Sequence, residues 1–295
     1  RHFRDLLIHR RPMDLSNGNA LVARLALSAL EHGAHLFTSS AVTALERDDR
    51  GVTGVRVANS RGEVRITASR GVVLATGGFS HDAARRTALF PHSARGQSHH
   101  SPVPDTLTGD GLRIAEAVGA RLNLNQAHAA CWTPVSRVPR GDGRFVNFPH
   151  LIDRQKPGFI AVTADGKRFV NEASSYHDFG KAMISACEGQ SEVGAFLIAD
   201  HRAMRRYGMG AARPYPLPIA EHIRSGYLIR AETPGELARA AGITLDPFLE
   251  TLETYNRHAR EGHDPEFGKG SNPYNCYNGD QTHHPNCLLY TSPSP

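Results

Sequence analysis

Residues 72–79, with the sequence Val-Val-Leu-Ala-Thr-Gly-Gly-Phe, decide the fold. The apolar run 71–75 is typical of a β-strand buried on both faces, and it leads directly into small residues. Glycine tolerates positive φ and lets a ligand approach the backbone, whose N–H groups can face phosphate or ribose oxygens. Because ligands of α/β sheets bind at the carboxyl ends of strands, this stretch predicts an α/β fold with a ligand site. A tight turn without a ligand is the structural alternative.

The residues before about 125 alternate between helix and strand patterns. An i, i+4 apolar stripe predicts a helix over 20–32, which ends at Gly33. Short apolar runs separated by turn residues predict strands. The predicted strands are 34–38, 41–46, 52–58, 63–67 and 71–75. A second helix is predicted over 112–118.

From about residue 126, prolines and aromatic residues become more frequent. The capping-box sequence 233–236, with proline at the first helical position, predicts a helix start. The pair Asp246-Pro247 predicts the cap of a further helix that ends before Gly262. The other predicted elements are strands 159–163 and 195–199, a hairpin turn at 165–166 leading into 168–170, and a helix over 176–187.

Composition excludes several classes of protein. The 295 residues carry a formal net charge of +5, but the basic residues are spread along the chain, so nucleic-acid binding is not expected. No apolar run is long enough for a transmembrane segment. The four cysteines lie far apart and adjacent histidines chelate poorly, so we expect no metal site and a reducing, cytoplasmic setting.

Two further segments carry polar groups suited to chemistry. In 108–115 (Thr-Gly-Asp-Gly-Leu-Arg-Ile-Ala), Asp110 could cap a helix or accept a hydrogen bond from a ligand hydroxyl. Segment 165–178 gathers many ionisable groups at a strand–loop–helix junction. Its structural interpretation is a hairpin in which Arg168 pairs with Glu172; its functional interpretation is a catalytic cluster.

Taken together, the Ala-Thr-Gly-Gly-Phe turn (75–79), the Thr-Gly-Asp-Gly helix start (108–111) and the hairpin 166–172 resemble the FAD-dependent fumarate reductase and succinate dehydrogenase flavoprotein superfamily. Segments in 132–151 and 264–286 resemble its 3-ketosteroid delta-1-dehydrogenase-like branch. The resemblance implies an α/β fold with an α+β cap: a partial FAD/NAD(P)-binding Rossmann-like domain with an inserted cap domain. It places the middle of the FAD-binding domain at 1–125 and the cap, or substrate, domain at 126–286.

The resemblance also implies FAD as the cofactor. In the family, the backbone near the strand after the first helix touches adenine, and a Gly-Gly turn and an aspartate lie beside FAD. The matching positions here are Val42 for adenine, Ala75, Thr76, Gly77 and Gly78 for the turn, and Asp110 for the aspartate.

Tyr176 stands where fumarate reductases have a proton-donating arginine, and 3-ketosteroid dehydrogenases resemble this chain in having tyrosine there. In those enzymes the tyrosine helps remove a proton beside a carbonyl while hydride leaves to flavin N5. A free tyrosine has a pKa of ~10, so a base role near neutral pH needs help from its surroundings. We therefore expect Tyr176 to transfer the proton, His177 and Glu172 to support it, and Arg168 to position the hairpin.

The expected function is FAD-dependent oxidoreduction of a CH–CH bond in a small molecule. The substrate would be a 3-ketosteroid-like or other carbonyl-activated compound to be dehydrogenated, or an enoate to be reduced; the electron donor or acceptor is not indicated. The alternative is a non-catalytic ligand-binding or interaction module derived from such a flavoprotein.

The two ends of the chain carry expectations of their own. The family begins with a GxGxxG turn that receives the FAD pyrophosphate, and this sequence contains no GxGxxG. We therefore expect an internal fragment that is inactive and colourless alone. Residues 287–295 match the translation of a sequencing-library transposon end, so we expect them to be a non-native tail after Asn286.

Overall fold

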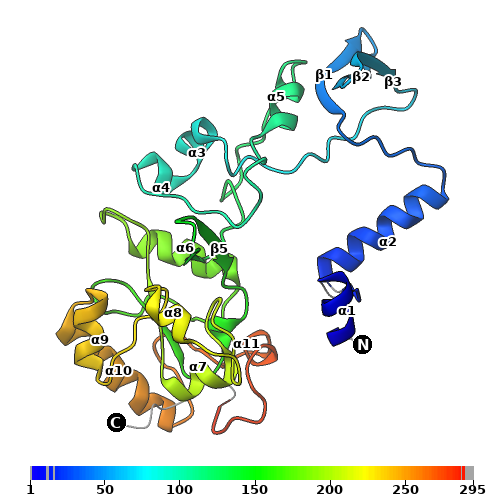
Figure 1. The fold of residues 1–295 in the computed structure, drawn as a ribbon. Helices are drawn as coiled ribbons and strands as arrows, with labels where there is room; N and C mark the ends of the chain where they lie inside the picture. The colour runs from blue at the N-terminus through cyan, green and yellow to red at the C-terminus, as the bar shows by residue number, and fades with distance from the viewer. Residues whose placement is uncertain (1, 11–12, 16, 287, 290–295) are drawn as a thin grey trace. The chain divides into compact units, whose positions relative to one another are not determined.

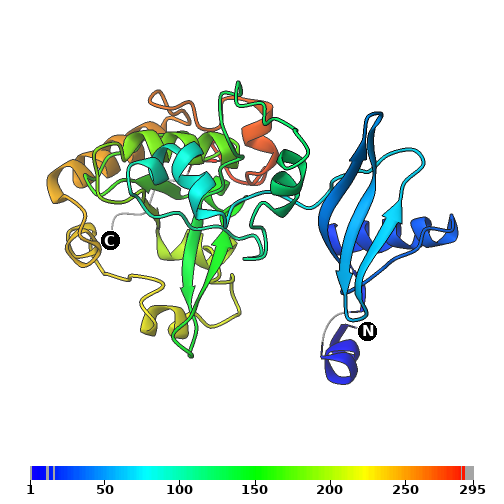
Figure 2. The ribbon, with the colours of Figure 1, turned by 90° about the horizontal axis from the view of Figure 1, so that it is seen from above.

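The structure is a computed structural model in which contacts divide the chain into two units. The first unit is Arg1–Ala75 with Gly111–Arg121, and the second is Thr76–Asp110 with Leu122–Pro295. Figures 1 and 2 show the helices and strands of each unit. The structure describes all residues except 1, 11–12, 16, 287 and 290–295. The domain boundary expected after residue 125 stays a prediction.

The first unit contains a three-stranded antiparallel sheet in the order β1-β2-β3 (Figure 1). Its strands are β1 (Ala41–Asp48), β2 (Gly51–Asn59) and β3 (Gly62–Thr67). All three were predicted, because each connection carries turn residues; in the first, the Asp48 carboxylate accepts a hydrogen bond from Arg50 N at 2.8 Å. The local sequence is therefore sufficient to form this meander.

The same unit begins with two helices, α1 (His2–His9) and α2 (Asn17–Glu31). Helix α2 confirms the predicted helix over 20–32. None of its residues is buried, and the apolar stripe that predicted it, including Leu21 and Leu25, is exposed. The described helices include none that is both long enough and apolar enough to cross a membrane.

Two predicted strands of the first unit are not formed. Residues 34–38 and 71–75 are irregular, and Val73 is 90% exposed. A strand buried on both faces takes its backbone hydrogen bonds from neighbouring strands. None of the described strands pairs with either segment, so an apolar run alone does not produce a strand at these positions.

The second unit opens with two short helices that the sequence did not predict, α3 (Ala83–Leu89) and α4 (Pro91–Ala94). Asp82 caps α3 by accepting a hydrogen bond from Arg85 N. Gln97 then joins this segment to the rest of the unit, because its side-chain amide donates to the carbonyl oxygens of Cys187 and Gln190 at 3.1 and 2.8 Å.

The predicted helix over 112–118 is confirmed as α5 (Asp110–Glu116), which begins at the boundary of the two units.

Two antiparallel strand pairs form the centre of the second unit, β4 (Val135–Pro139) with β5 (Phe145–Pro149) and β6 (Phe159–Val162) with β7 (Phe196–Ala199). Strands β6 and β7 confirm the predictions for 159–163 and 195–199. The extended segment 168–170 contributes only an isolated bridge between Val162 and Arg168. The helices are η1 (Asp153–Gln155), α6 (Tyr176–Ala186), α7 (His201–Tyr207), α8 (Ala220–Arg224), α9 (Pro234–Ala241), α10 (Leu245–Arg260) and α11 (Pro273–Tyr277).

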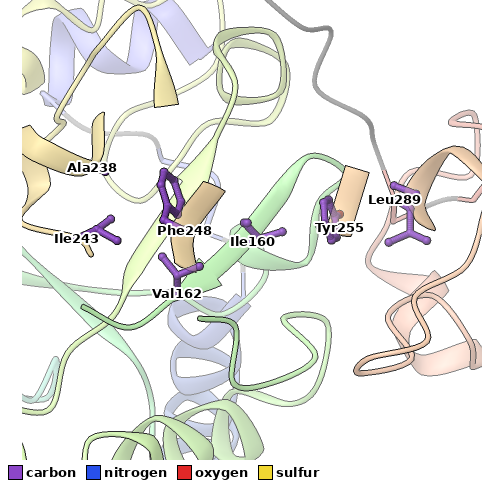
Figure 3. Close-up of a cluster of buried hydrophobic side chains, with 8 residues drawn as sticks. Ile160, Val162, Ala238, Ile243, Phe248, Tyr255 and Leu289 are labelled. Atoms are coloured by element: carbon purple, nitrogen blue, oxygen red, sulfur yellow. The ribbon is translucent and has the colours of Figure 1, made fainter. Parts of the chain in front are cut away.

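The main hydrophobic core of this unit lies where α9 and α10 cover β6 (Figure 3). Helix α9 begins with the predicted capping box, in which Thr233 and Glu236 satisfy each other's backbone N–H groups. The predicted Asp246 cap of α10 is wrong, because the N-cap is Thr244 and Asp246 lies in the first turn. The buried members of the core are Ile160, Val162, Ala238, Ile243, Phe248, Tyr255, Ala259 and Leu289.

Residues 288–289 are the described part of the expected tail, and both leucines are buried. Residues 287 and 290–295 lie outside the described residues. The non-native origin of 287–295 therefore stays a prediction.

Replacing Gly166 with alanine should lower the free energy of unfolding by about 3 kcal/mol, from strain and overpacking combined. Gly166 has φ +81°, and an added Cβ would lie 2.6 Å from Phe248 N and 2.8 Å from Thr244 O, both backbone atoms. Gly189 is the matched control, with the same φ and no atom near its Cβ position; its change to alanine should cost about 1 kcal/mol. Denaturant unfolding followed by circular dichroism measures both, and equal losses would contradict the predicted clash with α10.

Candidate functional site

The structure brings two of the predicted ligand-binding segments together in the second unit. Gly109 N donates to Gly78 O at 3.2 Å, which joins the 76–78 turn to the 108–110 segment. Gly77 has φ +78°, and a Cβ there would collide with the side chain of Leu107. The positive φ favours glycine at this position, and any larger residue would also require the Leu107 side chain to move.

These segments have surfaces that suit FAD. Thr76, Gly77 and Gly78 are exposed, and the space beside the Gly78 Cα is open. The Asp110 carboxylate is also exposed and accepts a hydrogen bond from the Thr108 hydroxyl at 3.0 Å. An exposed glycine backbone can approach phosphate or ribose oxygens, and a carboxylate can accept from ribose hydroxyls.

The other two predicted FAD contacts lie in the first unit. Val42 is on β1 and pairs with Val57 of β2, and its side chain is exposed. Ala75 is exposed in the irregular segment that was expected to be a strand. Their contact with FAD stays a prediction.

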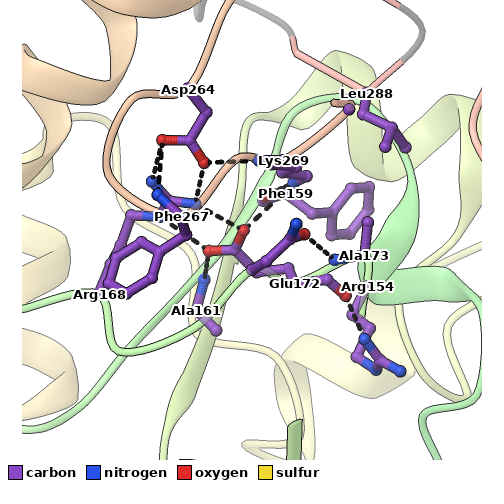
Figure 4. A network of polar contacts seen from close by, with 12 residues as sticks. Arg154, Phe159, Ala161, Arg168, Glu172, Ala173, Asp264, Phe267, Lys269 and Leu288 are labelled. Carbon is purple, nitrogen blue, oxygen red and sulfur yellow. Dashed lines mark hydrogen bonds and ion pairs between the residues drawn. The ribbon is translucent and has the colours of Figure 1, made fainter. Parts of the chain in front are cut away.

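The hairpin residue Arg168 forms the centre of a buried ion-pair network (Figure 4). Its Nε and Nη2 donate to the two carboxylate oxygens of Glu172, each at 2.9 Å. Its Nη1 and Nη2 donate to the two oxygens of Asp264 at 3.1 and 3.0 Å. Both pairs are bidentate, which is the strongest geometry for a guanidinium–carboxylate contact, and the Arg168 side chain is fully buried.

A half-exposed third carboxylate, Glu266, accepts from Arg168 Nη1 at 3.3 Å, and Lys269 adds a second buried cation to the network. Its ammonium lies 3.6 Å from Glu172 Oε2 and donates to the Phe159 carbonyl oxygen, while Ala161 N donates to Glu172 Oε1 at 3.0 Å. Burial lowers the pKa of Lys269 to about 8 despite the attraction of Glu172. Burial alone would raise the pKa of Glu172, but the charges of Arg168 and Lys269 hold it below its usual value.

The pairing of Arg168 with Glu172 confirms the structural interpretation of the hairpin. Through these contacts the network links the loop before α6 to β6 and to the segment around Asp264. Sequence reasoning did not find Asp264 or Lys269 as partners. Asp264 is 96 residues from Arg168, and no local pattern connects positions so far apart.

Tyr176 is the first residue of α6 and lies next to this loop. Ser175 caps the helix by accepting from Asp178 N at 3.1 Å, and Tyr176 remains 39% exposed. The N-terminal end of a helix carries partial positive charge, which favours a nearby anion. The role of Tyr176 in proton transfer stays a prediction.

His177 faces a different neighbour from the one expected. Its Nδ1 accepts a hydrogen bond from Trp132 N at 3.1 Å, and its ring packs edge-on against His128 at 4.9 Å between centroids. Gly180, one turn along α6, allows this close approach, since a Cβ there would lie 2.6 Å from Trp132 Cβ. The structure therefore assigns His177 a contact with the 128–132 segment, and its support of Tyr176 stays a prediction.

Comparison with known proteins identifies the family. The FAD binding domain family model matches residues 1–291. The 4-oxocyclohex-2-ene-1-carboxylate 5-dehydrogenase of Sinomonas cyclohexanicum is 40% identical, over 96% of this chain and 48% of that protein. The 3-oxosteroid 1-dehydrogenase of Mycolicibacterium smegmatis is 33% identical, over 91% of this chain and 48% of that protein.

A solved structure has a similar fold over the whole chain. The crystal structure of 3-ketosteroid delta1-dehydrogenase from Sterolibacterium denitrificans, in complex with 1,4-androstadiene-3,17-dione, matches with a TM-score of 0.83 and 30% identity. The match covers 100% of this chain and 53% of that one, so the chain spans about half the length of the relatives it matches. The predicted fold class and FAD cofactor are confirmed, and the chain belongs to the FAD binding domain family.

Proposed function

We propose that this chain is part of an FAD-dependent enzyme that oxidises a CH–CH bond beside the carbonyl group of a ring ketone. The observation that carries the proposal is Tyr176, an exposed tyrosine at the N-terminal end of α6. The names of the similar dehydrogenases support the substrate class, since 4-oxocyclohex-2-ene-1-carboxylate and 3-oxosteroids are both ring ketones.

In this proposal Tyr176 receives the proton from the carbon next to the carbonyl. Bound FAD would supply the acceptor for the hydride of the neighbouring carbon, so that two C–H bonds would break as one C=C bond forms. Reduction of an enoate is the same proton and hydride exchange in reverse, with Tyr176 as the proton donor. The bidentate pairs of Arg168 hold the loop before α6 and so position Tyr176.

The residues proposed to hold FAD are the exposed turn Thr76–Gly78 and Asp110, together with Val42 and Ala75 of the first unit. The contact between Gly78 and Gly109 supports the joint role of the turn and Asp110.

We further propose a cytoplasmic location, since the described cysteines Cys131, Cys187 and Cys276 carry free thiols.

The test uses the protein expressed together with its flanking coding sequence. We expect a bound flavin that is bleached anaerobically by a ring ketone and re-oxidised by an artificial electron acceptor. The substrates to compare are 4-oxocyclohexanecarboxylate, 4-oxocyclohex-2-ene-1-carboxylate and a 3-ketosteroid, with fumarate as the dicarboxylate control. A protein that binds FAD but leaves all of these compounds unchanged would reject the proposal and favour the non-catalytic alternative.

A further inference from the structure

The loop just before Tyr176 contains a residue, Ala173, that is completely buried. It follows Glu172 directly and lies beside the ion-pair network (Figure 4). A buried backbone N–H or C=O group cannot reach water, so each needs a hydrogen-bond partner within the protein. Both groups of Ala173 find one in an asparagine side chain, that of Asn171 or of Asn275, and these residues are only 9% and 2% exposed.

The two asparagines close a ring of hydrogen bonds on Ala173. Ala173 N donates to Asn171 Oδ1 at 2.9 Å, and Asn171 Nδ2 donates to Asn275 Oδ1 at 2.9 Å. Asn275 Nδ2 then donates to Ala173 O at 3.1 Å. These three contacts, here called the asparagine ring, attach the loop before α6 to α11, because Asn275 belongs to that helix.

The backbone fixes the direction of every hydrogen bond in the asparagine ring. A backbone N–H only donates, so the Asn171 atom that faces Ala173 N is its oxygen, and its nitrogen faces Asn275. A backbone carbonyl only accepts, so the Asn275 atom that faces Ala173 O is its nitrogen. Gly270 N also donates to the Asn275 oxygen, at 3.4 Å. The ring therefore needs amides, since a carboxylate only accepts and an alkyl group does neither.

The carbonyl groups on either side of Ala173 are held as well. The buried guanidinium of Arg154 donates to Glu172 O, and Gln155 Nε2 donates to Ser174 O at 3.4 Å. Both donors belong to η1. Three successive carbonyl groups of the loop thus accept from buried side chains of η1 and α11, so contacts to the backbone itself fix the path of the loop.

This loop leads directly to Tyr176. Ser174 N donates to Asn171 O at 3.0 Å, which closes a turn, and the next residue, Ser175, is the N-cap of α6. A shift of Ala173 would therefore also shift the tyrosine, which is only three residues further along the chain. Proton transfer requires the base within hydrogen-bond reach of the proton, and a misplacement of ~1 Å can slow an enzyme by ~100-fold.

We propose that Asn171 and Asn275 are positioning residues for the proton transfer by Tyr176. By holding the backbone of Ala173 they fix the start of α6 and with it the place of the tyrosine hydroxyl. The inference rests on the proposed function of Tyr176. It differs from the role given to Arg168, because the asparagines are neutral and act on the backbone of the loop.

The test measures turnover per bound flavin for Asn275→Ala in the enzyme expressed with its flanking coding sequence. With a ring ketone as substrate we expect kcat to fall by about 10- to 100-fold. KM should stay nearly unchanged, because the lost placement matters in the transition state. A merely structural role would reduce the amount of flavin-loaded protein and leave the kcat of each loaded molecule unaltered.

Asn147→Ala is the matched control for Asn275→Ala. Asn147 Nδ2 donates to Ser101 O at 2.7 Å, so the control removes the same kind of amide-to-carbonyl contact away from the loop. Its kcat should equal that of the parent enzyme.

Repeating the change in the Tyr176→Phe enzyme shows whether Asn275 acts through Tyr176. Without the tyrosine hydroxyl, Asn275→Ala should lower the remaining kcat by less than about 2-fold, since residues that act as a unit have non-additive effects. An equal fold loss in both backgrounds would overturn the proposal.

Asn171→Ala opens the ring from its other side and leaves α11 unchanged, so it is the second variant if Asn275→Ala is recovered without flavin. It should lower kcat to a similar extent. A kcat within about 2-fold of the parent in either flavin-loaded variant, together with a slow Tyr176→Phe, would overturn this inference and leave the proposed function intact. A normal rate in Tyr176→Phe would instead overturn the proposed role of Tyr176, and this inference with it.

Discussion

Replacing Tyr176 with phenylalanine should slow turnover of the enzyme, expressed with its flanking coding sequence, by about 100-fold or more, the usual contribution of general acid–base catalysis. The change keeps the aromatic ring at the start of α6 and removes the oxygen that would receive or supply the proton. Steady-state rates with a ring ketone and an artificial electron acceptor measure the effect. The amount of bound FAD should be unchanged, because Tyr176 is not among the residues proposed to hold it.

The control for this experiment is Tyr277→Phe, a change at a tyrosine that is 82% exposed near the end of α11. It should leave turnover nearly unaltered. If Tyr176→Phe also turns over at close to the normal rate, Tyr176 has no part in proton transfer, while the FAD-binding proposal remains open to its own test.

Replacing Arg168 with methionine should lower the free energy of unfolding by about 3–5 kcal/mol, the cost of removing one partner from a buried ion pair. Glu172 and Asp264 would remain buried without the guanidinium that now binds both of them. Denaturant unfolding of the purified chain, followed by circular dichroism, measures the loss.

The pH dependence provides a second measurement of the same network. Burial alone would raise the pKa values of Glu172 and Asp264, but Arg168 holds both below their usual values. Carboxylates with lowered pKa values stabilise the folded state above their unfolded values of about 4, and this contribution is lost as the pH falls through the folded values. Without Arg168, burial dominates and the acid-induced loss of stability should begin at a higher pH.

Arg224→Met is the matched control for Arg168→Met. Arg224 pairs with Glu221 on the surface, where both side chains are more than 70% exposed, and such pairs contribute at most about 1 kcal/mol. A loss below about 1 kcal/mol in Arg168→Met, with no change in the acid transition, would show that the network contributes little to stability.

Local sequence was sufficient for elements that close their own hydrogen bonds. The β1-β2-β3 meander and the capped helix α9 follow from turn residues and a capping box within the segments themselves. The segments 34–38 and 71–75 were predicted incorrectly, because a buried strand depends on neighbours that the local pattern does not contain.

In the candidate site too, contacts between nearby residues were predictable from the sequence and contacts between distant residues were not. Arg168 and Glu172 are only four positions apart, so their pairing can be predicted from the sequence alone. The sequence motifs also identified the family and its cofactor. By itself the sequence therefore determined the flavoprotein family, the meander, the helices α6, α9 and α10 of the second unit and the pairing of Arg168 with Glu172. Only the tertiary structure decided that Asp264 and Lys269 complete the buried network, and that Asn275 closes the asparagine ring on the loop before α6. The reason is physical: these contacts join residues up to about a hundred positions apart, and only the packing of the folded chain brings such residues together.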